Sequence, residues 1–389
     1  MKQLIMRLKP YSIFIFFVLM LALTFPQNLS KSSESSRNAI ITTVGVDKTD
    51  ENYELTFISF TPTAGKEFVE VYDLISSEGD SLSGALKNAE LNLGKVIEFY
   101  HTENLVVGKE AQNNMVEILD YFVREKTLAF SSVLVGTESS AKDFLTKLYK
   151  QNDNPSAVIN ELMLYNSKQV YYQKPTIEVF FSGYYSPLKT SYIADLDINP
   201  EGEQEQGGDK SQESSKSSRK IIKNTGELRI FKDGKLVYKL SSEDVNGLNW
   251  FQESITDRYI KVEKDGQIKM YHMDNKSVNR KVEMKDNQPI FKLNLKIHID
   301  KQEVQEVGKK HIEVKELTNE EQDLIKESVR SEIKQAIDKL AELKAGNQVY
   351  KMFYREERIK FKKFLETLEN TDEFLSKVIF DVQIDLLDD

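Results

Sequence analysis

The stretch 101–136 constrains the fold more than any other part of this chain. It contains two short apolar runs, 105–107 and 133–135, and each run is closed by a glycine, Gly108 or Gly136. Between the runs, four apolar residues recur at the spacing i, i+3, i+4 and i+7, which places them on one face of a helix: Met115, Ile118, Leu119 and Phe122. Two buried strands joined by about fifteen helical residues predict a β-α-β crossover, which requires parallel strands in a covered sheet.

Length and composition limit the classes of protein to consider. The 389 residues are enough for two or three domains of about 150 residues each. The net charge of -9 argues against nucleic-acid binding, which needs a basic face, and against adhesion of the folded body to an anionic membrane surface. Cysteine is absent, which excludes disulfides, thiolate metal sites, a cysteine nucleophile and lipid attachment to an N-terminal cysteine.

The first residues are typical of a targeting segment. Positive charges at Lys2, Arg7 and Lys9 precede the uninterrupted apolar run 13–23, so residues 1–25 are predicted to be a signal peptide or an uncleaved membrane anchor. In either case the positive-inside rule places the rest of the chain outside the cytoplasm. Residues 26–37 are polar and rich in serine, which is typical of a flexible tether.

Residues 38–173 are predicted to form an N-terminal α/β domain. Alternating apolar residues predict strands at 39–46, 53–60 and 68–75, and a helix is expected to start near Asp80 or Ser81 and to end at Gly94. After the crossover, the capping box formed by Ser140 and Asp143 begins another helix, and Pro155 fits the first turn of the next.

Residues 174–258 are predicted to form a middle domain. The run 176–181 reads as a strand, and residues 199–219 contain nothing apolar to bury and are predicted to be a disordered insertion. A phosphate loop at Gly207 is excluded because no strand precedes it and no Gly-Lys-Ser/Thr follows. Asp233 and Gly234 predict a hairpin turn, and a short helix then leads to Trp250, the single tryptophan, which we interpret as a core anchor rather than a sugar-binding residue.

Residues 259–389 are predicted to form a C-terminal α/β domain. Period-2 patterns at 259–273, 277–284 and 290–300 indicate an antiparallel sheet with one face in water, where His298 is expected to be exposed. A second capping box, Thr318 with Glu321, begins a long helix at 318–345, for which coiled-coil pairing is the alternative. A further helix at 349–364 and a final strand at 378–386 complete the chain.

The search for chemistry finds no catalytic constellation. Nucleophile-elbow, zinc-protease and dinucleotide-binding motifs are absent, and we predict no catalytic, cofactor-binding or metal-binding residues. Two His-x-Glu pairs, His101 with Glu103 and His311 with Glu313, could place a base and a carboxylate on one face of a strand. Such pairs are common by chance in a chain that is 30% charged, so we do not expect catalysis there.

The order of these elements resembles the Ger(x)C family, the C subunits of spore nutrient-germinant receptors. Four segments carry the resemblance: 41–48 (ITTVGVDK), 101–124 with its histidine, strand-glycine pair and Arg124, the hairpin 231–237 with its following helix and Trp250, and the long helix followed by Gln348, Tyr350 and Lys351. These segments span nearly the whole chain after residue 38. Two departures are the absent lipobox cysteine, replaced by the segment 25–28, and the segment 126–129, which lacks the second arginine usual in the family.

The resemblance implies a three-domain, mixed α/β (α+β) extracytoplasmic protein with mixed sheets and no enzyme activity. It implies a location on the outer face of the cytoplasmic membrane, ending on the spore inner membrane, and assembly with two integral-membrane subunits that sense germinants. The N-terminal segment, rather than a lipid, would provide membrane attachment here. Two alternatives remain: an extracytoplasmic protein that binds a small ligand in an interdomain cleft, as part of another envelope system, and a secreted hydrolase.

Overall fold

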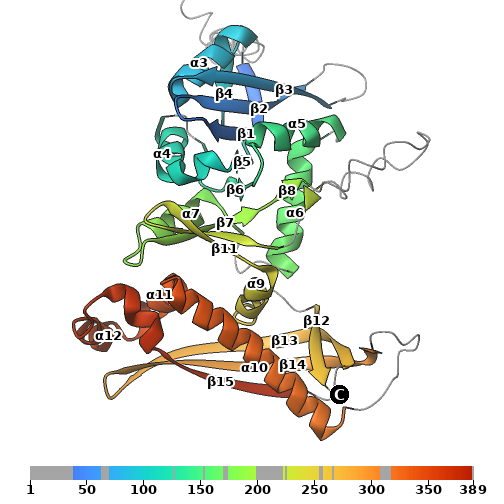
Figure 1. Ribbon diagram of the computed structural model, residues 1–389, viewed down its shortest axis with the longest axis vertical. Helices are drawn as coiled ribbons and strands as arrows, with labels where there is room; N and C mark the ends of the chain where they lie inside the picture. The colour runs from blue at the N-terminus through green and yellow to red at the C-terminus, as the bar shows by residue number, and fades with distance from the viewer. Residues whose placement is uncertain are drawn as a thin grey trace, which may run out of the picture.

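The computed structural model describes residues 38–62, 70–125, 128–151, 154–169, 174–198, 222–223, 226–253, 257–264, 267–306 and 317–387. They form a mixed α/β protein in which one large sheet lies above a smaller one along the longest axis (Figure 1). The predicted N-terminal segment, the tether, the insertion at 199–219 and the pair His311 with Glu313 lie outside these residues. None of the described helices is long and apolar enough to cross a membrane.

The larger sheet has nine strands in the order β11-β10-β7-β6-β5-β1-β2-β3, with β4 beside β1. Its strands are β1 (Asn38–Lys48), β2 (Tyr53–Pro62), β3 (Glu70–Gly79), β4 (Val96–Glu98), β5 (Asn104–Val107), β6 (Val133–Gly136), β7 (Thr190–Asp195), β10 (Leu228–Lys232) and β11 (Lys235–Leu240). Strands β1, β5, β6 and β7 are parallel, whereas the hairpins on both sides are antiparallel. The predicted boundary at 173/174 falls within this sheet, and the three-domain division stays a prediction.

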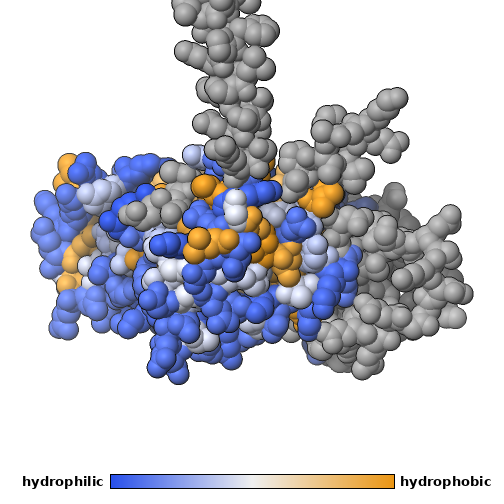
Figure 2. Space-filling view, turned by 90° about the horizontal axis from the view of Figure 1, so that it is seen from above, coloured by the Kyte–Doolittle hydropathy of each residue, from blue (hydrophilic) through white to orange (hydrophobic). Residues whose placement is uncertain are grey.

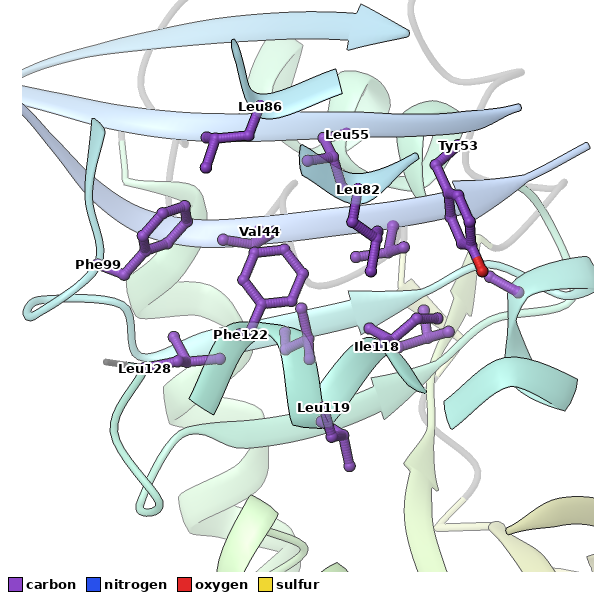
Figure 3. Close-up of a cluster of buried hydrophobic side chains, with 14 of the residues drawn as sticks. Val44, Tyr53, Leu55, Leu82, Leu86, Phe99, Ile118, Leu119, Phe122 and Leu128 are labelled. Carbon is purple, nitrogen blue, oxygen red and sulfur yellow. The ribbon is translucent and has the colours of Figure 1, made fainter. Parts of the chain in front are cut away.

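The β-α-β crossover is confirmed: β5 and β6 pair in parallel and are fully buried. The connection is less regular than a single helix, because it consists of a 3-10 turn (Glu110–Asn114), α4 (Met115–Asp120) and a π turn (Tyr121–Glu125). The four residues predicted to share a face are all buried in one cluster with β1, β2 and α3 (Leu82–Leu93) (Figure 3). Side-chain periodicity therefore identified the buried face correctly even though the backbone departs from a regular helix.

Helices cover both faces of the sheet. On one face lie α3, α4 and α7 (Ile177–Tyr184), and on the other α5 (Ala141–Gln151), α6 (Pro155–Gln169) and the short α9 (Ser242–Asn249). The predicted caps are present: the Ser81 side chain accepts from the Gly84 amide, and the Ser140 side chain accepts from the Asp143 amide. A small two-stranded sheet, β8 (Asp197–Ile198) with β9 (Ile222–Lys223), flanks α5.

The strand predicted at 176–181 is wrong, because this segment begins α7. The Thr176 side chain caps the helix by accepting from the Val179 amide at 3.3 Å. The β-branched and aromatic composition favours a strand, but burial at helical spacing, with Ile177, Phe180 and Gly183 inside, decides in favour of a helix.

The smaller sheet has the order β12-β13-β14-β15, with β12 (Arg258–Lys264), β13 (Gln267–Lys285), β14 (Gln288–Glu306) and β15 (Ile379–Leu387). The first three strands are antiparallel as predicted, but β15 pairs with β14 in parallel. The helices α10 (Asn319–Glu342), α11 (Asn347–Glu356) and α12 (Arg358–Leu365) lie between these two strands in the chain. The connection is therefore a second crossover, and α10 lies across the sheet (Figure 1) rather than in a coiled coil.

The capping box of α10 is present as predicted. The Thr318 side chain accepts from the Glu321 amide at 3.2 Å, and the Glu321 carboxylate accepts from the Thr318 amide at 3.0 Å. Burial alone would raise the pKa of Glu321, but hydrogen bonds from Thr318 and the ammonium of Lys269 outweigh it and lower the pKa to about 2.

Candidate functional site

Of the residues considered for chemistry in the sequence, the structure describes His101, Glu103 and His298. His101 and Glu103 are both exposed, and Glu103 accepts a hydrogen bond from the Asn160 amide group. His298 is half-buried rather than exposed, and its Nδ1 contacts the Asp274 carboxylate. Within the described ranges, no group of three or more His, Cys, Asp or Glu is placed to hold a metal ion.

Open sheets with parallel strands often bind ligands beyond the carboxyl ends of those strands. In this chain the protein itself fills that edge. Asp47, at the end of β1, accepts hydrogen bonds from the amides of Ala141 (2.7 Å) and Lys142 (2.8 Å), so it satisfies the N-terminus of α5. A Cβ on Gly108, just after β5, would lie 1.9 Å from the Asp47 carboxylate, which explains the glycine there. This carboxylate is therefore committed to holding the fold.

A buried arginine fills the neighbouring part of the same edge. The Arg229 side chain is almost fully buried and donates to Asp195 (2.6 Å), Gln112 (2.9 Å) and Glu138 (2.8 Å). Lys239 also contacts Asp195 at 2.6 Å. A buried charge that has every partner it needs is typical of a structural network rather than of a site waiting for substrate. At the described part of the carboxyl edge, Asp47, Asp195 and Arg229 are thus all bonded to other groups of the protein.

The joint between the two sheets is built from directional polar contacts. Asn347, at the start of α11, is buried, and its amide group donates to the carbonyls of Thr190 and Gly183. Its carbonyl accepts from the Ser186 hydroxyl at 2.7 Å. The Lys232 ammonium, at the end of β10, bridges to the Asp372 carboxylate at 2.6 Å.

Trp250 forms a second part of this joint, and the prediction of a core anchor is confirmed because the ring is fully buried. Its indole donates to Glu332 on α10 at 2.8 Å, and the Arg258 guanidinium donates to the same oxygen while lying 4.6 Å from the ring centroid. The ammonium of Lys276 lies 5.3 Å from the ring and donates to the Asn249 carbonyl at 2.6 Å. Burial, reinforced by the nearby charge of Arg258, lowers the pKa of Lys276 to about 7.

A cavity of about 300 Å³ lies where the two sheets meet, and it is the principal candidate for a functional site. Its walls come from both parts of the chain, since α7, β7, β10 and β11 contribute from above and β13, β14, α10 and α11 from below. Most of the lining side chains are apolar. The charged ones are Glu178, Arg280 and Lys351. The sequence did not reveal this site, because these residues are spread over more than 170 positions.

A groove on the outer surface of α7 begins beside the cavity. Asp120, Arg124, Phe130, Phe181 and Tyr185 contribute to its walls, and Glu178 and Ser182 line both the groove and the cavity. Phe130 is 52% exposed and Tyr185 is 75% exposed, which is unusual for large aromatic side chains.

The far end of the upper sheet is also partly apolar. Leu91 on α3 is 70% exposed, and Val96 at the start of β4 is 57% exposed. Val96 pairs with Asn38, where the described chain begins. Figure 2 looks onto this end and shows hydrophobic patches among hydrophilic residues. Because the described chain begins at this end of the protein, the apolar segment 13–23 precedes it by fewer residues than it precedes any other described part.

These features define a class of protein: a mixed α/β protein with two sheets that meet around a mainly apolar cavity. At the carboxyl ends of its parallel strands, side chains with structural roles occupy the edge of the larger sheet. Two family models match it in order. "Spore germination protein N-terminal domain" matches residues 31–198, and "Spore germination B3/ GerAC like, C-terminal" matches residues 226–386. The chain belongs to this family of spore germination proteins, the C subunits of germinant receptors, as its sequence resemblance indicated.

Among solved structures, one described as "Crystal Structure of the GerBC protein" is similar to this chain. The TM-score is 0.49 and the sequence identity is 17%, over 89% of this chain and 97% of that one. No curated protein matches the sequence.

Proposed function

We propose that this protein is the non-catalytic C subunit of a spore germinant receptor. It assembles with two integral-membrane subunits on the outer face of the cytoplasmic membrane, which becomes the spore inner membrane, and supports nutrient-triggered germination. Residues 1–25 attach it to the membrane in place of a lipid, because the chain has no cysteine. The observation that carries the proposal is the match of both family models, in order, to most of the chain.

The geometry supports a role in contact rather than catalysis. At the carboxyl edge of the parallel strands, Asp47 and Arg229 are held by protein partners. The exposed imidazole of His101 has no carboxylate beside it that the structure places within reach, since Glu103 contacts Asn160 instead. A carboxylate that orients a catalytic imidazole lies within hydrogen-bond reach of it, about 3 Å.

The proposal is tested first by co-purification. A tagged full-length chain is extracted from spore membranes in mild detergent, and two integral-membrane proteins should co-purify with it in fixed ratio. The matched control replaces residues 1–25 with a cleavable signal, which should release the body from membranes when the partners are absent. Recovery of the chain alone from intact membranes would contradict the assembly.

A germination assay tests the absence of catalysis. Spores that lack the gene should lose the nutrient response, and the His101→Ala variant should restore it fully. Charge reversals on the exposed face of α10, such as Glu327→Lys and Arg330→Glu, sample a contact surface. Most reversals should be silent, because interfaces concentrate their energy in few residues. A folded His101→Ala protein that fails to restore germination would overturn the non-catalytic reading.

A small-ligand-binding function is the second candidate, and the joint cavity is the observation that favours it.

A further inference from the structure

The joint cavity has the size of a small-molecule site. Its volume of about 300 Å³ is at the lower limit of ordinary ligand pockets. An engineered apolar cavity of about 150 Å³ admits benzene, which has six non-hydrogen atoms. By that scale the joint cavity has room for about a dozen non-hydrogen atoms.

The walls of the cavity call for an apolar occupant. Both parts of the chain supply aliphatic and aromatic side chains: Leu228, Ile230 and Leu240 from above, and Phe291, Ile337 and Leu340 from below. Buried apolar surface binds apolar ligand surface at about 25 cal/mol per Å² removed from water. A polar metabolite would lose its hydration along most of these walls, and the lining side chains of Ser191 and Asn347 already hydrogen-bond within the protein.

Two cations interrupt the apolar lining. Arg280 lies on β13 between Val278 and Val282, both of which are buried, so its side chain shares the helix-covered face of the sheet. It is half-buried, and its cross-strand neighbour Leu293 is fully buried. Among the described residues, no carboxylate forms an ion pair with this half-buried guanidinium, which leaves its donors available to an anionic ligand.

Lys351 on α11 is the second cation. Its ammonium donates to the Ser182 hydroxyl at 2.7 Å across the joint. Both residues are exposed, so this contact lies at the rim of the cavity, and within the described part of the chain no carboxylate pairs with the ammonium. Partial burial lowers the pKa of Lys351.

The one acidic residue in the lining does not neutralise these cations. Glu178 is exposed, and it also lines the outer groove beside Phe181, so its carboxylate stands at the rim in solvent. Solvent screens its field at the interior. Lys351 stands at the same rim, so among the charged lining residues Arg280 alone is half-buried, and the rest of the inner lining is mainly apolar.

We propose that the joint cavity binds a small monocarboxylate with an apolar body, of about ten to twelve non-hydrogen atoms. The apolar body lies between the walls from the two sheets, and the carboxylate is held by Arg280, by Lys351 or by both. This site does not depend on the receptor role, because it rests on the cavity and its charges alone.

The test uses the full chain in lipid nanodiscs, with empty nanodiscs as the reference for partitioning into lipid. The probe is 3-phenylpropionate, and 3-phenylpropanamide is the uncharged ligand of the same shape. Binding is measured by calorimetry. The carboxylate should bind at least about tenfold more tightly than the amide, the effect expected for one charge-assisted hydrogen bond.

Variants distinguish binding of the ligand's carboxylate from binding of its apolar body. Arg280→Met and Lys351→Met preserve most of the side-chain volume, and at least one of them should weaken carboxylate binding about tenfold while amide binding stays within about twofold. Lys362→Met, an exposed lysine on α12 away from the cavity lining, is the matched control and should bind like the wild type. Val349→Phe narrows the cavity and should weaken both ligands.

Location is checked independently of any variant. A diazirine-bearing carboxylate of the same size, activated by light, should label peptides from α7, β13 or α11. Three results would overturn the proposal: no binding above empty nanodiscs, equal binding of carboxylate and amide, or labelling confined to other parts of the chain. Failure of partner co-purification would leave this site standing, so the two proposals fail separately.

Discussion

The crossing of α9 and α10 allows a decisive test of how the two sheets are joined. Gly247, in the interior of α9, lies against the backbone of α10: a Cβ at this position would be 2.2 Å from the Glu332 carbonyl oxygen and 2.6 Å from the Cβ of Ala336. The same Glu332 accepts hydrogen bonds from Trp250 and Arg258 through its side chain. Any displacement of α10 at this point therefore also strains those bonds.

Two effects of Gly247→Ala oppose each other, and their magnitudes decide the outcome. Alanine in a helix interior is more favourable than glycine by about 1 kcal/mol. Forcing an extra carbon into a packed contact costs about 1–3 kcal/mol, and the upper part of this range applies here because the obstacle is backbone rather than a flexible side chain. We expect a net loss of about 1–2 kcal/mol in the free energy of unfolding.

Trp250 makes this measurable, because it is the only tryptophan and it is buried in this joint. Its fluorescence during urea unfolding of the full chain in mild detergent reports the loss of the α9–α10 contact. With a slope of about 2 kcal/mol per molar urea, the midpoint should fall by about 0.5–1 M. The control Asn246→Ala, one position earlier, also gains helix propensity but adds no atom against α10. It should not lower the urea midpoint. A Gly247→Ala protein as stable as the wild type would refute the close packing.

Three further predictions use urea unfolding. Between pH 7 and 10.5 the unfolded chain binds more protons at Lys276 than the folded protein does, so wild-type stability rises across this window. The free energy of unfolding of Lys276→Met should therefore exceed that of the wild type most at pH 6, and this difference should shrink by pH 9. Arg229→Met should cost about 3 kcal/mol, the lower end of the range for breaking a buried ion pair, because Lys239 still contacts Asp195, and adding Asp195→Leu should recover part of the loss. Glu321→Gln should be less stable than the wild type at pH 7, and the difference should vanish as pH falls from 4.5 to about 2, where the carboxylate of the folded protein is protonated.

Features set by neighbours in the chain could be predicted from the sequence. The buried face of α3, the capping box of α10, and the left-handed turn at Asp233 and Gly234 all follow from residues within a few positions of one another. The capping box of α10 needs only Thr318 and Glu321 at the right spacing. These local rules hold because no distant contact competes with them.

Features that depend on distant contacts could not be predicted. The segment Ile177–Tyr184 has strand-like composition, yet it is helical because the burial of Phe180 against Phe231 outweighs propensity. The parallel pairing of β15 with β14 is also invisible in the alternation of Val382 and Ile384, since period 2 does not distinguish parallel from antiparallel neighbours. The cavity is the extreme case, because Lys351 meets Ser182 from 169 residues away.

The contacts around the cavity bear on how an occupant would act. Asn347, Lys232 and Lys351 each join the two sheets by a directional bond, and all three lie close to the cavity or in its lining. A ligand that contacts both walls gains its full binding energy only when the sheets stand as they do here. The ligand would therefore stabilise this arrangement of the sheets relative to an opened one. The stabilisation equals the difference between the ligand's binding free energies for the two arrangements. Removing the bond between Lys351 and Ser182 weakens the same arrangement without filling the cavity, so Ser182→Ala should lower ligand affinity although the serine carries no charge.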